Sequence, residues 1–198
     1  MVFYFSLGIL ILFFGASRFK TGRFFNKHKR SSLVAFYLSL VAIFILLFYQ
    51  SYSQYQIWSQ NEPSKYLLPP YQSIHYFVFY IFTRFFAPYL ISLAAAFLFL
   101  FSAKKLNKKY GECFFEPEEP YFGALALFLT GWPGALFYFI SLILIYLFLH
   151  LLSSVVSRWS LVKERRISLY YLWLSVAIFV IIIQRWLELL PLWRLLKF

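Results

Sequence analysis

The chain has 198 residues, of which 62% are hydrophobic and 25% aromatic, and its formal net charge is +12 at pH 7. A soluble domain of this size with a mean hydropathy of +0.71 would expose large apolar patches and aggregate, so the composition indicates a polytopic membrane protein. The basic residues gather at the ends of apolar segments, as membrane topology requires, which argues against nucleic-acid binding.

The chain contains a series of apolar blocks, and most have about the length of a membrane-spanning helix, roughly 20 residues. Within the printed sequence, the first three blocks cover residues 2–16, 33–48 and 85–101. The next block, 121–156, is too long for one crossing, and the block 167–183 closes the series. The chain is therefore expected to be all-α, in a single transmembrane domain over residues 1–198.

Two segments, one between these blocks and one after them, are expected to lie outside the membrane or at its surface. Residues 51–73 are poor in charge and are expected outside the membrane, followed by an interfacial helix, or the start of a tilted third crossing, over 74–84. The tail is expected to form an interfacial amphipathic helix, because five apolar residues fall on roughly one face: Trp186, Leu189, Leu190, Trp193 and Leu196.

Three basic runs set the expected topology. They lie at 18–30, 104–109 and 158–166, and the positive-inside rule places all three in the cytoplasm. An even number of crossings must then separate the second run from the third, so 121–156 is a helical hairpin. Its break is predicted at Gly131-Trp132-Pro133-Gly134, after a short helix of about 11 residues. About six crossings result, with both termini outside.

The first basic run has the sequence Arg18-Phe19-Lys20-Thr21-Gly22-Arg23-Phe24-Phe25-Asn26. It resembles the D-I-K-T-G-R-I-P-N segment of the prepilin (type IV leader) peptidases, the GxGD class of intramembrane aspartyl proteases. Five residues match that segment: Lys20, Thr21, Gly22, Arg23 and Asn26. Arg18 stands at the position of the first catalytic aspartate. The resemblance implies a protein of the prokaryotic inner membrane.

Two further segments resemble the same family in the same order. Residues 112–125 align with its G-x-G-D segment, which places Glu118 at the second aspartate and Phe115, Glu116 and Pro117 over the glycine pair. Gly131-Trp132 resembles the L-G-W that ends the short helix of these proteases, and residues 166–172 resemble their I-P-F-G-P-F-L.

The chemistry of an aspartyl protease requires two carboxylates that share a proton. This chain has no Asp, and Arg18 offers only hydrogen-bond donors. No catalytic residue is therefore expected, and we hypothesise that Arg18 and Glu118 form an ion pair in place of the acid dyad. No cofactor or metal is expected either, since Cys113 is the only cysteine and the three histidines are scattered.

Plainer interpretations remain open for the same residues. Lys20 and Arg23 suit a topology determinant, and the Glu residues near 118 suit the solvated start of a helix. His150 is either functional or bonded to a main-chain carbonyl near the inner interface.

Three functions remain in competition. The first is a non-catalytic binding or scaffold subunit whose partners are membrane lipids and a prepilin-like helix or a pilus or secretion assembly protein. The second is a membrane peptidase with altered chemistry that uses Glu118. The third is a small transporter or lipid-handling protein, against which the lack of a duplicated half argues.

Overall fold

The computed structural model describes residues 2–18, 29–111, 115–116, 118–159 and 170–197, and the elements in these ranges are all helical. The first half contains α1 (Val2–Arg18), α2 (Lys29–Gln60), the single turn α3 (Glu62–Lys65), α4 (Ile74–Ile81), the π-helical turn η1 (Phe82–Phe86) and α5 (Ala87–Lys109). The second half contains α6 (Glu119–Thr130), α7 (Gly134–Trp159), α8 (Tyr170–Leu187) and α9 (Pro191–Leu196).

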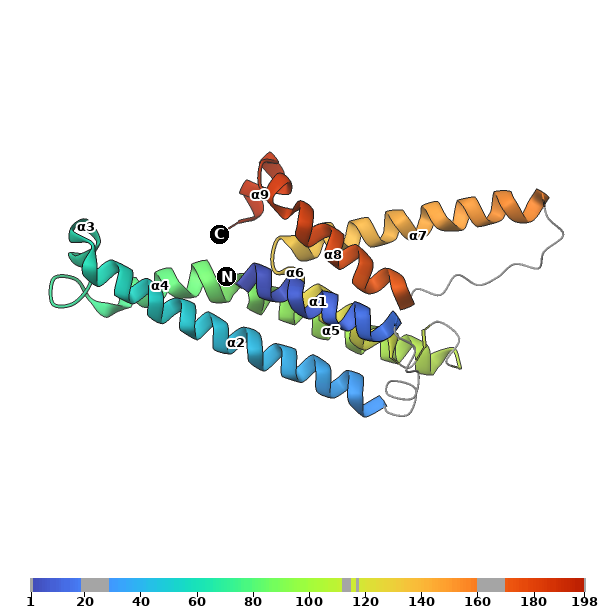
Figure 1. Ribbon diagram of the computed structural model, residues 1–198, viewed down its shortest axis with the longest axis horizontal. Coiled ribbons are helices and arrows are strands. Elements are labelled where there is room, and N and C mark those ends of the chain that lie inside the picture. Colours follow the sequence, from blue (N-terminus) through green and yellow to red (C-terminus); the bar gives the residue numbers. More distant parts are fainter. Residues whose placement is uncertain (1, 19–28, 112–114, 117, 160–169, 198) are drawn as a thin grey trace.

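Three helical stretches within the described ranges are long and apolar enough to cross a membrane. They are Leu33–Gln60, Ile74–Lys109 and Gly134–Leu152, while the apolar helices Val2–Gly15 and Leu172–Leu187 are shorter. The helical elements and the three long apolar stretches support the expectation of an all-helical membrane protein. Figure 1 shows both chain ends near the same end of the bundle as the turn between α6 and α7.

The segment 74–84 is the first part of the long helical stretch Ile74–Lys109, which favours the second of the two alternatives that the sequence left open. Helix α4 continues through η1 into α5 without a break. Pro88 has no N–H to donate to the carbonyl four residues earlier. Just before it, the main-chain hydrogen bonds widen from the i→i−4 to the i→i−5 pattern, and the Ala87 N–H donates to the Phe82 carbonyl. The widened turn carries Arg84.

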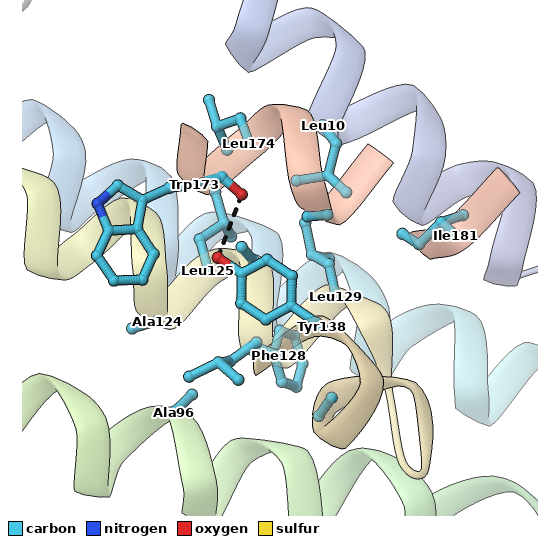
Figure 2. Packing of buried hydrophobic residues seen from close by; sticks show 14 of the residues in the cluster. Leu10, Ala96, Ala124, Leu125, Phe128, Leu129, Tyr138, Trp173, Leu174 and Ile181 are labelled. Carbon is cyan, nitrogen blue, oxygen red and sulfur yellow. Dashed lines mark hydrogen bonds between the residues drawn. The ribbon is translucent and has the colours of Figure 1, made fainter. Parts of the chain in front are cut away.

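Helix α6 is the centre of the molecule. It has 12 residues, which corresponds to about 18 Å, and all of them except Tyr121 are buried. Helices α1, α2, α5, α7 and α8 all contact it. Figure 2 shows α6 side chains packed among residues of α1, α5, α7 and α8, including Leu10, Ala96, Ala124, Leu125, Phe128, Leu129, Tyr138, Trp173, Leu174 and Ile181. A helix shorter than the roughly 30 Å hydrocarbon core is thus enclosed by longer ones.

The predicted hairpin break is confirmed at Gly131–Gly134. Gly131 ends α6 with φ +63°, a conformation that favours glycine, and the Trp132 N–H donates to the Pro88 carbonyl at 3.1 Å. The returning helix α7 is tied to α8 by the buried Tyr138 hydroxyl, which donates to the Trp173 carbonyl at 3.2 Å (Figure 2).

The prediction of one amphipathic tail helix is wrong. Helix α8 ends at Leu187 and a separate short helix, α9, begins at Pro191, because the residue before a proline is driven to extended backbone; Leu190 has ψ 138°. Trp186 is 78% exposed, whereas Trp193 is 2% exposed and stacks on Phe137 at 5.3 Å between ring centroids. The two tryptophans therefore do not share one interfacial face.

Candidate functional site at the start of helix α6

Most of the first motif falls outside the described residues. Arg18 is the last residue of α1, and its side chain is not among those described. Lys20, Thr21, Gly22, Arg23 and Asn26 lie outside the described residues, as do Pro117 and 160–169. The Arg18–Glu118 ion pair stays a prediction. Figure 1 shows the C-terminal end of α1 at the same end of the bundle as the C-terminal end of α5 and the start of α8.

Two glutamates open α6 in different environments. Glu118 is the N-cap residue and is partly buried, whereas Glu119 is 3% exposed. The Glu119 carboxylate accepts a hydrogen bond from the Glu116 N–H at 3.2 Å, and the Glu119 N–H donates to the Glu116 carbonyl at 3.1 Å. Glu119, one residue beyond the position aligned with the aspartate, is therefore the buried acid of the two, and it closes a local turn.

The environment of Glu118 disfavours the charged form of its carboxyl. Burial raises the pKa of its carboxyl above the ordinary value, and the neighbouring Glu116 carboxylate raises it further. Of the two residues aligned with the catalytic aspartates, Glu118 is the one whose side chain the structure describes.

Asn107, near the end of α5, fixes the segment that leads into α6. Its side-chain amide donates to the Phe115 carbonyl at 2.9 Å, while its amide oxygen accepts from the Phe115 N–H at 3.1 Å. A single carboxamide thus satisfies both main-chain polar groups of one residue, as a residue on a neighbouring antiparallel strand would. Asn107 is 8% exposed, so these bonds are shielded from water. The sequence reasoning missed this residue, because a lone asparagine beside four lysines carries no motif.

An aromatic cluster fills the space between this segment and α6. Phe99 lies 5.1 Å from Trp173 and 6.5 Å from Phe115 between ring centroids, and the Phe115 and Trp173 rings are 6.3 Å apart. The three rings come from α5, the 115–116 segment and α8. A Cβ atom on Gly123 would lie 2.6 Å from the Phe99 ring and 2.9 Å from the Trp173 ring. The cluster is therefore packed against the backbone of α6 with no room for a methyl group.

The other candidate groups lie elsewhere. His150 is exposed on α7, where its ring centroid is 6.3 Å from that of Tyr146. Among the residues that the structure describes, no three His, Cys, Asp or Glu side chains are grouped so that they could hold a metal ion. The Lys104 ammonium lies 4.4 Å from the Tyr121 ring centroid, which adds a cation–π contact beside the start of α6.

Asn107 and the aromatic cluster thus hold the main chain at Phe115, and the carboxyl of Glu118 lies nearby at the start of α6. The chain matches no family model, no curated protein and no solved structure.

Proposed function

We propose that the protein is a non-catalytic binding or scaffold protein built on a prepilin-peptidase-like transmembrane scaffold. The motif at Arg18–Asn26 supports the scaffold, and the lack of any Asp in the chain supports the loss of catalysis. In this proposal the chain crosses the prokaryotic inner membrane about six times, with both termini outside. The three long apolar helices and the two shorter ones supply five of these crossings, and α6 with its flanks supplies the sixth.

The observation that carries the proposal is the position of Phe115. This residue aligns with the first glycine of the family's G-x-G-D segment, where the proteases have flexible backbone. Here its ring packs with Phe99 and Trp173, and its peptide groups are held by Asn107. A segment fixed in this way does not bend to admit a substrate strand.

The carboxylates support the same conclusion. Glu119 accepts the Glu116 N–H and so serves the backbone of the segment. In the proposal, Glu118 pairs with Arg18, and the pair joins α1 to the start of α6 and fixes its geometry more than it adds stability.

The ion pair is tested by exchanging its members. Arg18→Glu with Glu118→Arg should unfold at the same temperature as the original chain, whereas Arg18→Asp alone should lower that temperature by placing like charges together. Equal unfolding temperatures for all three proteins would disprove the pairing.

The proposed partner is a prepilin-like helix or a pilus or secretion assembly protein. The protein is reconstituted in liposomes with a peptide that comprises a prepilin leader and its first transmembrane helix, labelled with a photo-crosslinker. We expect crosslinking to the protein and no cleaved peptide by mass spectrometry. A scrambled apolar helix of equal length serves as the control, and equal crosslinking of both peptides would contradict the proposal.

A membrane peptidase with altered chemistry is the second candidate, and the raised pKa of Glu118 favours it. The same assay separates the two functions, because cleavage of the peptide that disappears in Glu118→Gln would show that the Glu118 carboxyl is required for catalysis. Cleavage would overturn the non-catalytic proposal even if crosslinking is also seen.

A further inference from the structure

A polar pocket of about 240 Å³ lies at the opposite end of α6 from the candidate site. We call it the turn pocket, because the turn after α6 at Thr130, Gly131 and Trp132 forms one wall. The other walls come from α1, α2, the η1–α5 junction and α8. Five segments distant in sequence therefore converge on one small space.

Side chains that donate hydrogen bonds line this space from three directions. Gln50 comes from α2, Arg84 from η1 and Gln184 from α8, and within the described part of the chain none of the three side chains has a recorded hydrogen-bond or ion-pair partner. The hydroxyl of Ser6 lines the same pocket, is 1% exposed, and faces the hydroxyl of Tyr89, which is also part of the lining. Polar groups gathered at a membrane-embedded bundle without partners are costly unless a ligand or water satisfies them.

The charge of the pocket favours an anion. Arg84 is the only charged residue among the described residues that line it, and no carboxylate opposes it there. A guanidinium presents a planar fork of donors that suits an oxyanion. Donors that approach from different helices suit a tetrahedral phosphate, which has more acceptor oxygens than a planar carboxylate. The deeper walls include Leu47, Leu129 and Ile181, which suit an apolar or glycerol portion.

Backbone features hold these groups in place. The π-helical turn before Pro88 carries Arg84, and the Trp132 N–H bonds to the Pro88 carbonyl at 3.1 Å. Gly131 has φ +63°, and a Cβ atom added to it would lie 3.7 Å from the Tyr89 ring, so the ring lies close beside the turn. The pocket is thus built by rigid elements rather than by a chance gap between side chains.

We infer that the turn pocket binds a phosphate group, with Arg84 as its counter-ion and Gln50, Gln184 and Ser6 as hydrogen-bond donors. The phosphate belongs either to the headgroup of an anionic phospholipid or to a soluble phosphate ester. This site is separate from the start of α6, and the inference does not depend on the proposed function.

Arg185 provides a matched control. It follows Gln184 on α8, does not line the pocket, and donates to the Tyr4 hydroxyl at 2.8 Å. Arg84→Gln and Arg185→Gln therefore remove the same charge near the same end of the bundle, but only the first changes the pocket. Both arginines are exposed in the structure, so neither change disturbs the core.

The experiment measures bound lipid by native mass spectrometry. The full chain, purified in detergent, is titrated with phosphatidylglycerol, and a saturable complex with one lipid is expected. Arg84→Gln should weaken this complex on the order of tenfold, the effect of losing one charged hydrogen-bonding group, and Arg185→Gln should leave it unchanged. Gln184→Leu, which keeps the charge, should also weaken it.

Glycerol 3-phosphate distinguishes the two sources of the phosphate. If it raises the unfolding temperature and displaces phosphatidylglycerol in an Arg84-dependent way, the site is assigned to a soluble phosphate ester. If only phosphatidylglycerol binds with that dependence, the site is assigned to a lipid headgroup. Equal weakening by Arg84→Gln and Arg185→Gln, or no saturable complex with either ligand, would overturn the inference.

Discussion

The indole N–H of Trp132 donates a hydrogen bond to the main-chain carbonyl of Leu196 at 2.8 Å, across 64 residues of sequence. The donor belongs to the turn between α6 and α7, and the acceptor belongs to α9. Together with the stacking of Trp193 on Phe137, this bond holds the C-terminal tail against the hairpin. The tail is therefore part of the tertiary structure, packed beside the turn pocket.

Trp132→Phe keeps most of the ring and removes this donor. We expect the unfolding free energy to fall by about 1 kcal/mol, the usual value of such a bond, and hydrogen exchange at the Lys197 amide to accelerate. Trp186→Phe is the control, because Trp186 is 78% exposed and should change neither quantity. Equal effects of the two substitutions would mean that the tail is not held by this bond.

Gly123→Ala should destabilise the protein by about 2 kcal/mol, because the new methyl group would overlap the Phe99 and Trp173 rings. Thermal or denaturant unfolding in detergent measures the change. Gly8→Ala is the matched control, since no atom lies within 4 Å of its added Cβ and alanine is favoured in a helix.

The overlap at Gly123 also predicts a rescue. Phe99→Leu removes ring atoms from the crowded space, so the double variant should lose less stability than the two single losses added together. Simple additivity would show that the aromatic cluster does not contact Gly123 in the folded protein.

Asn107→Leu should lower the unfolding free energy by about 2 kcal/mol, because it leaves the partly buried Phe115 N–H and carbonyl without this partner. Hydrogen exchange at the Phe115 amide should accelerate. Asn107→Asp keeps the acceptor for that amide and loses the donor to the carbonyl, so the exchange rate should rise less. If exchange at Phe115 is as slow in the Leu variant as in the original chain, the segment is held by other contacts.

The pKa of Glu118 predicts a pH dependence of stability. Because the folded pKa is raised, the folded chain binds the proton more tightly than the unfolded chain. The unfolding free energy should therefore be larger below the ordinary Glu pKa and decrease as the pH rises through the interval up to the folded value. Glu118→Gln should flatten this part of the profile.

Glu116→Gln tests the cause of the raised pKa. It removes the neighbouring charge and leaves the burial of Glu118, so the slope of unfolding free energy against pH should diminish without disappearing. An unchanged slope in Glu118→Gln would assign the pH dependence to another group.

Several features of the fold could be predicted because their causes are local. Hydropathy and block length identify the long apolar helices, and the missing N–H of Pro133 with the conformational freedom of Gly131 marks the hairpin break. The short length of α6 follows from the position of that break. Two alternatives stay open for the segment 74–84 in the sequence, an interfacial helix or the start of a crossing, since an apolar segment before a proline suits either one.

The tail shows where a local pattern misleads. Five apolar residues at helical spacing suggested one interfacial helix, but Pro191 divides the segment, and Trp193 is buried against Phe137. A periodic pattern records which residues are apolar and not which surface covers them.

The sequence by itself determined the class of the protein, an all-helical membrane protein, and the place where its hairpin turns, because hydropathy and backbone chemistry act over a few neighbouring residues. Only the tertiary structure decided that α6 is enclosed on all sides, that Glu119 rather than Glu118 is the buried acid, and that Arg84, Gln50 and Gln184 meet in one pocket. These relationships join residues far apart in the chain, and they exist only once five helices have packed around the sixth.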